Sequence, residues 1–197
     1  MATRRQGVAR IRSQPCLEAL DVLGIHDTTV ILDIDGTITG DGQVFLSDSV
    51  LAKIRELASR NVVYVFSNHR NNTRNNTRNR IVASRIGCAL IETPHRKPSP
   101  NVLLGLPRHH RVQPLLVIGD KIIIDGLFAR RIGARFIRVG RVRSASDRSF
   151  VRMTYLLDDL VAAIGAIWRK PEAVQETIPT GPCSPNKQSS ESRSSAR

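Results

Sequence analysis

Short apolar runs alternate along this chain with longer segments in which apolar residues recur every three or four positions. The runs predict buried strands at residues 29–33, 62–66, 89–91, 115–118 and 135–139. The segments between and after them predict helices at residues 47–58, 72–86, 99–106, 122–132 and 155–168. Repeated strand–helix units of this length predict an α/β fold, doubly wound and Rossmann-like, with a mostly parallel sheet of about five strands covered on both faces.

Composition divides the chain into three parts. Residues 1–24 are predicted to be a basic N-terminal extension, residues 25–170 one folded domain, and residues 171–197, rich in Ser, Pro and Gly, a disordered tail. The arginine-rich start faintly resembles an organellar transit peptide, and we favour a disordered basic tail instead. No apolar run approaches the roughly 20 residues of a membrane span, so we expect no transmembrane segment. The few, widely spaced cysteines favour a reducing, cytoplasmic location, which is compatible with peripheral contact with a membrane.

Positive charge is concentrated in one part of the chain. The net charge is +13, and the segment from Arg60 to Arg111 contains ten basic residues and one acidic residue. Arg70, Arg74 and Arg78 are four residues apart and would form one basic stripe on a helix. Such a stripe either attracts polyanions through contacts with phosphate or is a solvated face that keeps the protein soluble.

Polar side chains follow the predicted strands at their carboxyl ends, where ligands bind in doubly wound folds. Asp33 and Asp35 close the first strand, and side chains two apart on a strand point the same way. Two carboxylates about 4 Å apart repel by about 4 kcal/mol at an effective dielectric constant near 20, so this pair indicates a bound cation or a shared proton. The other polar residues near strand ends are Thr37, Ser67, Asn68, Lys97, Asp120 and Asp125.

These residue types suit phosphate chemistry. Three carboxylates with open positions make an oxygen-rich site for Mg²⁺, which keeps several waters and accepts substrate phosphate. A hydroxyl, backbone N–H groups and a lysine can hold phosphate oxygens. One Asp can attack phosphorus, while a second carboxylate two residues later can protonate the leaving oxygen and then activate water. The sequence therefore predicts a magnesium site that acts on a phosphorylated substrate.

At these residues the sequence resembles the haloacid dehalogenase (HAD) superfamily. The four motifs of that superfamily match, in chain order, DIDGT from Asp33 to Thr37, then Ser67, then Lys97, and GDKIIID from Gly119 to Asp125. The resemblance covers roughly residues 25–140. It implies a HAD-type phosphatase, a phosphoric monoester hydrolase that uses Mg²⁺ and an aspartyl-phosphate intermediate.

The resemblance also implies a role for each matched residue. Asp33 would be the nucleophile, Asp35 the general acid and base, and Lys97 the third catalytic residue. Mg²⁺ would be held by Asp33, the backbone carbonyl of Asp35, and Asp120. The residues that hold the phosphoryl group would be Ser67, Asn68 and Lys97, and the supporting residues would be Thr37 and Asp125.

About 30 residues separate Asp35 from Ser67, and about 30 separate Ser67 from Lys97, so we expect no large cap domain. The chain most resembles the capless subfamily III phosphatases, in the YqeG-type branch related to phosphatidylglycerophosphate phosphatases. That branch usually has Gln where this chain has Lys121, and Gly-Gly-Asn-Arg where this chain has residues 128–131. These differences concern the substrate rather than the core chemistry.

Three interpretations of the biological role stay open on the sequence alone. A lipid phosphate such as phosphatidylglycerophosphate, at an anionic membrane surface, follows from the resemblance. A nucleic-acid terminal phosphate follows from the charge, although 4% aromatic residues provide no evident base-stacking platform. A basic RNA- or ribosome-associated binding protein on a HAD fold follows from the arginine-rich segments. The sequence predicts no oligomeric state.

Overall fold

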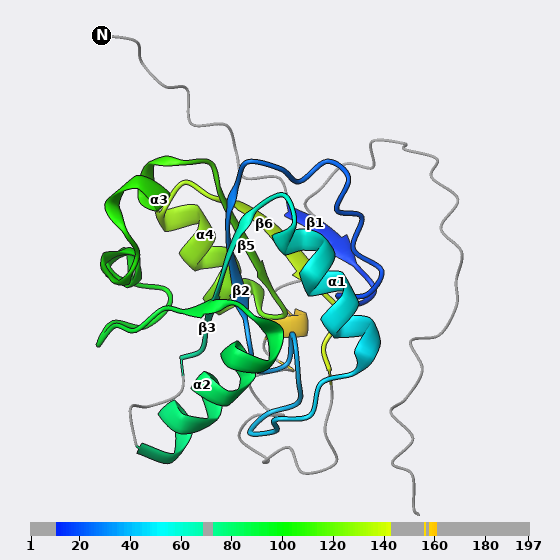
Figure 1. Cartoon of the computed structure of the whole chain (residues 1–197). Helices are drawn as coiled ribbons and strands as arrows, with labels where there is room; N and C mark the ends of the chain where they lie inside the picture. The colour runs from blue at the N-terminus through cyan, green and yellow to red at the C-terminus, as the bar shows by residue number, and fades with distance from the viewer. Residues whose placement is uncertain (1–10, 69–72, 143–155, 157, 161–197) are drawn as a thin grey trace, which may run out of the picture.

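Six parallel strands form one sheet at the centre of the molecule. The computed structural model describes residues 11–68, 73–142, 156 and 158–160 of the chain. The sheet has the strand order β1-β6-β5-β2-β3-β4 (Figure 1). The strands are β1 (Ile11–Gln14), β2 (Thr29–Asp33), β3 (Val62–Phe66), β4 (Ala89–Leu90), β5 (Leu115–Gly119) and β6 (Arg135–Val139). This arrangement confirms the predicted α/β fold, and the order reverses beside β2, as in other doubly wound sheets.

The first strand corrects the predicted boundary of the folded domain. β1 pairs in parallel with β6, with Ile11 opposite Phe136 and Gln14 opposite Val139. Leu17 and the core residues that follow it before β2 are buried, so residues 11–24 are part of the domain and not an extension. The prediction was wrong because the sequence of β1, IRSQ, has no apolar run. An edge strand of this kind is defined by pairing with a distant strand rather than by its own pattern.

Helices and tight turns connect the strands largely as predicted. α1 (Asp48–Ala58) begins after Ser47, whose side chain accepts a hydrogen bond from the backbone N–H of Val50 at 3.3 Å. α2 (Thr73–Ile86) ends at Gly87, which has a φ of 70°. A 3₁₀ helix, η1 (Pro100–Gly105), follows β4.

Two details of the helices differ from the prediction. A short helix, α3 (Arg108–Val112), lies before β5 and was not predicted. The segment predicted as one helix at 122–132 begins as a π-helical turn, η2 (Ile122–Gly126), and continues as α4 (Leu127–Arg131). The predicted helix at 155–168 and the tail at 171–197 lie almost entirely outside the described residues.

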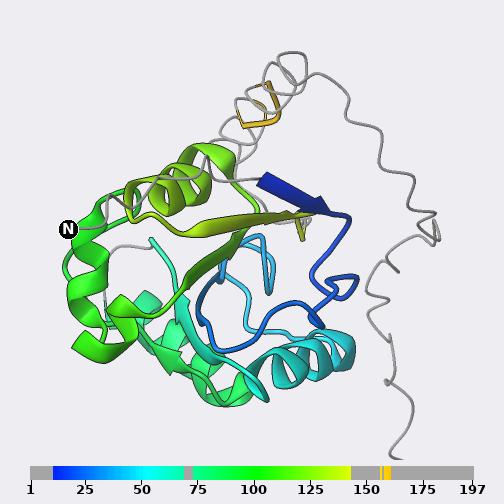
Figure 2. The ribbon, with the colours of Figure 1, turned by 90° about the horizontal axis from the view of Figure 1, so that it is seen from above.

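Side chains alternate between the two faces of the sheet and build two cores. On one face, Val30, Leu32 and Val65 pack with apolar residues of α1 and α2. On the other face, Ile31 and Phe66 pack with η1 and α4. Figures 1 and 2 show α1 and α4 on opposite sides of the sheet. This alternation leaves the carboxyl ends of the strands as the edge where polar side chains gather.

No helix among the described residues is long and apolar enough to cross a membrane.

Candidate active site

Asp33 and Lys97 form the centre of a buried polar cluster at the carboxyl end of the sheet. Asp33 is the last residue of β2, and Lys97 lies in the loop between β4 and η1. The Nζ of Lys97 donates hydrogen bonds to Oδ1 of Asp33 and, at 2.6 Å, to Oδ1 of Asp125. All three side chains are buried, and the ring of Phe66 lies 5.5 Å from the ammonium group. Residues from three separate parts of the chain thus meet at one point.

Asn68 holds the loop that carries Lys97. Its side-chain amide donates to the backbone carbonyl of Lys97 at 2.7 Å, and its side-chain oxygen accepts from the backbone N–H of Lys97, also at 2.7 Å. Both polar groups of the amide are therefore engaged with the main chain. These contacts fix the backbone of Lys97, and the contact of Asn68 with the phosphoryl group that the resemblance implied stays a prediction.

The carboxylate of Asp35 contacts residues at the end of β3 and on α2. Its carboxylate accepts a hydrogen bond from Oγ of Ser67 at 2.6 Å and one from the backbone N–H of Gly42 at 3.3 Å. It also forms an ion pair with Arg78 of α2 at 2.6 Å. Arg78 in turn donates to the backbone carbonyl of Gln43 at 2.8 Å. These contacts fix the carboxylate and connect α2 to the loop that follows β2.

Asp120 lies directly after β5 and has a fully buried side chain. Its Oδ1 accepts a hydrogen bond from Nζ of Lys121 at 3.1 Å, and its Oδ2 accepts one from Nε of Arg141 at 2.7 Å. Gly36, which has a φ of 85°, allows this carboxylate to approach the β2 loop, because a Cβ there would lie 2.7 Å from Oδ2.

Asp125 supports the same cluster from η2. Its Oδ1 contacts Lys97, and its Oδ2 accepts a hydrogen bond from the backbone N–H of Lys121 at 3.2 Å. A Cβ on residue 119 would lie 2.5 Å from the carboxylate of Asp125, so this close packing requires Gly119. The spacing GDxxxxD therefore places one carboxylate at the end of β5 and returns the second to the same point.

Burial and neighbouring charges perturb the central groups in opposite ways. Burial raises the pKa of Asp33 to about 7, because Lys97 and Lys121 only partly oppose the desolvation of the carboxylate and Asp125 and Asp120 add to the rise. Burial alone would lower the pKa of Lys97, but Asp125 and Asp33 raise it to about 12. Lys97 is therefore a permanent cation, whereas Asp33 titrates close to neutral pH.

The oxygen donors of this cluster fit a magnesium ion. Asp33, Asp120 and Asp125 each offer a carboxylate oxygen, and these atoms lie within 4.8 Å of one another. Hard carboxylate and carbonyl oxygens are the ligands that Mg²⁺ prefers in proteins. The buried hydroxyl of Thr37 has no hydrogen-bond partner among the described residues. Because buried polar groups are normally hydrogen-bonded, this hydroxyl is open to a partner that binds at the site.

Sequence reasoning missed three basic residues of the cluster, Arg78, Lys121 and Arg141. Arg78 was expected on an exposed basic stripe, yet its side chain is buried against Asp35, and Arg70 and the side chain of Arg74 lie outside the described residues. Lys121 and Arg141 each follow a strand at its carboxyl end. The rule that located the acidic residues could have located these two basic residues as well.

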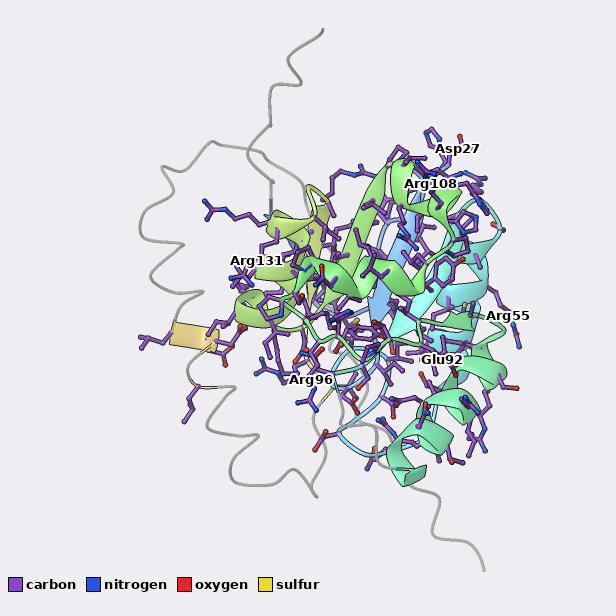
Figure 3. All side chains as sticks on the ribbon, turned by 90° about the vertical axis from the view of Figure 1, so that its left-hand side faces the viewer. Asp27, Arg55, Glu92, Arg96, Arg108 and Arg131 are labelled. Carbon is purple, nitrogen blue, oxygen red and sulfur yellow. The ribbon has the colours of Figure 1, made fainter. Side chains whose placement is uncertain are left out.

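Exposed arginines are not confined to the segment from Arg60 to Arg111. Figure 3 labels Arg55, Arg96, Arg108 and Arg131, which lie apart from one another on the side of the molecule that it shows. Several others contact groups of the protein itself, as Arg80 does with Glu92 at 2.8 Å. In the described part of the chain, the high positive charge is thus partly used in internal contacts.

A cavity of about 360 Å³ opens beside Ser67. It lies between α2 and the loop that follows β4. Its polar walls include Ser67, Asn76, Asn79, Thr93, His95 and Arg96.

Comparison with known proteins found a distant likeness among solved structures. No family model matches the chain, and no curated protein matches it. Among solved structures, the chain is similar to the core domain of a provisionally assigned phosphoglycolate phosphatase from Streptococcus pneumoniae TIGR4. The identity is 22%, the likeness covers 66% of this chain and 98% of the other, and the TM-score is 0.39. A likeness this distant carries no argument about function, which has to come from the site itself.

Proposed function

We propose that this chain is a HAD-type phosphatase that hydrolyses a phosphomonoester with the help of Mg²⁺ and through an aspartyl-phosphate intermediate. The observation that carries the proposal is the convergence of Asp33, Lys97, Asp120 and Asp125 on one buried point. They come from the ends of β2 and β5 and from two connecting segments. Desolvation of buried charges can cost more free energy than their contacts return, and such clusters are typical of catalytic sites.

In the first half of the proposed reaction, a carboxylate oxygen of Asp33 attacks phosphorus. A bond forms between that oxygen and phosphorus, and the bond from phosphorus to the leaving oxygen breaks. Lys97 neutralises charge on the phosphoryl group while remaining anchored by Asp125. Asp35 enters this step protonated and donates that proton to the leaving oxygen, which leaves Asp35 as a carboxylate for the second half.

In the second half, water attacks the phosphorus of the intermediate and releases inorganic phosphate and Asp33. Asp35 takes the proton of this water. To move protons at the reacting atoms, the carboxylate of Asp35 has to exchange its hydrogen bond from Ser67 for one to the substrate or the water. Ser67 is then released to donate to a phosphoryl oxygen, so one rearrangement prepares both residues.

Magnesium would be held by the side chains of Asp33 and Asp120 and by the backbone carbonyl of Asp35. When bound, it supplies positive charge that stabilises the phosphoryl oxygens as negative charge develops.

The cavity beside Ser67 is the proposed place of the leaving group. Its walls offer amide, hydroxyl and imidazole groups, which suit a hydroxyl-bearing leaving group. The glycerol part of a lipid head group such as that of phosphatidylglycerophosphate satisfies this requirement, and so do small sugar phosphates. The lipid substrate is the one that the sequence resemblance favours.

A phosphatase screen with purified protein tests the proposal. The substrates are p-nitrophenyl phosphate, phosphatidylglycerophosphate in mixed micelles, sugar phosphates and oligonucleotides with terminal phosphates, each with Mg²⁺ or with EDTA. We expect Mg²⁺-dependent release of phosphate by the wild type and a loss of at least about 1,000-fold in Asp33→Asn. Asp48→Asn, at the start of α1, is the matched control and should keep full activity. Equal activity of Asp33→Asn and the wild type would exclude this mechanism.

A further inference from the structure

Four basic side chains contact the four carboxylates of the site. Lys97 contacts Asp33 and Asp125, Arg78 contacts Asp35, and both Lys121 and Arg141 contact Asp120. Each carboxylate of the site thus has at least one basic partner among the described residues before any divalent ion is bound. A site built only to attract Mg²⁺ would keep an excess of negative charge at the ligand atoms.

Lys121 contacts the very atoms that are proposed to hold the metal. Its Nζ donates to Oδ1 of Asp120 at 3.1 Å and to the backbone carbonyl oxygen of Asp35 at 3.3 Å. Its own backbone N–H donates to Asp125, which fixes the start of the side chain beside the site. An ammonium group and a magnesium ion cannot both occupy the space between these two oxygens.

We propose that Lys121 is a tethered competitor of Mg²⁺: its ammonium group holds the position between Asp120 and the carbonyl of Asp35, and Mg²⁺ binds only when this side chain leaves. This inference rests on the proposed function, because the metal ligands are taken from it.

The surroundings of Lys121 permit such an exchange. Its side chain is 16% exposed, whereas that of Lys97 is 1% exposed and is enclosed between two carboxylates. The ammonium group of Lys121 is therefore close enough to solvent to exchange its contact with Asp120 for water, whereas Lys97 is enclosed and stays in place.

Competition of this kind weakens metal binding by a calculable factor. The apparent dissociation constant equals the intrinsic one divided by the fraction of molecules in which Lys121 has left. A charge of +1 that remains nearby raises it further by repulsion. Replacing Lys121 by an uncharged side chain of similar length removes both effects, and we expect Mg²⁺ to bind at least about tenfold more tightly.

The test is a calorimetric titration of the full-length, substrate-free protein with MgCl₂, so that the readout is binding and not turnover. The variants are Lys121→Met, Lys121→Gln and Lys121→Arg. Lys53→Met on α1 is the matched control, because it removes a lysine that pairs with Glu56 far along the chain from the site. Circular dichroism and thermal unfolding show which variants are folded, and the two neutral variants provide independent readings.

The proposal predicts tighter binding in Lys121→Met and Lys121→Gln and binding close to that of the wild type in Lys121→Arg and Lys53→Met. Equal or weaker binding in the folded neutral variants would overturn it, as would equal tightening in Lys53→Met. If the neutral variants bind Mg²⁺ no more tightly but the wild type is a phosphatase that depends on Asp33, this inference fails and the proposed function stands. If they bind more tightly and no variant hydrolyses any phosphate, the proposed function fails and the competition stands.

Discussion

The ion pair between Arg78 and Asp35 should contribute both to the stability of the folded protein and to the placement of a proposed catalytic residue. Arg78→Met removes the guanidinium group and keeps much of the apolar stem. Arg78 and Asp35 are 2.6 Å apart, and their side chains are 8% and 11% exposed. At this separation and an effective dielectric constant near 20, two unit charges attract by about 6 kcal/mol before desolvation is subtracted.

The net cost of Arg78→Met should be smaller than this attraction but still large. Removing one partner leaves the carboxylate of Asp35 buried with the hydrogen bonds from Ser67 and Gly42, and it also removes the hydrogen bond from Arg78 to Gln43. Removing one partner of a buried ion pair typically costs about 3–5 kcal/mol of stability. Because Asp35 keeps two hydrogen bonds, we expect Arg78→Met to lower the free energy of unfolding by about 3 kcal/mol.

Urea unfolding of a double-mutant cycle measures the effect. The cycle contains the wild type, Arg78→Met, Asp35→Asn and the double variant, and we expect a coupling free energy of about 2 kcal/mol. Arg85→Met is the matched control. Arg85 is on the same helix as Arg78 and donates a hydrogen bond to the backbone carbonyl of Val44 at 2.9 Å, next to the Gln43 carbonyl that Arg78 contacts, but Arg85 is exposed. It should cost less than about 1 kcal/mol. A coupling free energy near zero, or equal losses in Arg78→Met and Arg85→Met, would refute the reasoning.

Two further predictions follow from the same cluster. Asn68→Ala should lower kcat about tenfold or more with little change in KM, because the backbone of Lys97 loses both of its hydrogen bonds with the Asn68 side chain. Steady-state kinetics with p-nitrophenyl phosphate measures both constants, and an unchanged kcat would show that Asn68 does not position Lys97. The second concerns the pH dependence of stability, because burial raises the pKa of Asp33 in the metal-free protein from 3.8 to about 7. In the metal-free protein, ionisation of the buried Asp33 destabilises the folded state. Asp33→Asn should therefore raise the free energy of unfolding only slightly near pH 3.8, the pKa in the unfolded chain, and by the full amount above pH 7, about the pKa in the folded protein. A gain that is equal at pH values near 5 and near 8 would contradict this assignment.

The acidic half of the site could be predicted from the sequence because strand ends locate it. Asp33 and Asp120 directly follow apolar runs, and in a parallel sheet the carboxyl ends of the strands share one edge. These residues are placed by their immediate neighbours in the chain, which is the information that a sequence pattern contains.

The basic half depends on packing between distant segments. Arg78 is buried because α2 is oriented with this side chain toward Asp35, and a polar helix with several arginines gives no signal of which one turns inward. Lys121 contacts its chain neighbour Asp120, but its second contact, with the backbone carbonyl of Asp35 at 3.3 Å, joins segments that are far apart in the sequence. β1 was missed for a related reason, since its pairing partner β6 is more than a hundred residues away in the chain.

The central claim, that Asp33 is a nucleophile in a phosphatase reaction, is tested most directly by trapping the phosphorylated enzyme. The wild type and Asp33→Asn are mixed with p-nitrophenyl phosphate and Mg²⁺, quenched rapidly in acid, digested and analysed by mass spectrometry. We predict that the wild-type peptide containing Asp33 gains the mass of one phosphoryl group, that hydroxylamine removes it, and that the Asp33→Asn peptide gains none. Phosphate release by the wild type without labelling of this peptide, together with equal turnover by Asp33→Asn, would contradict the account.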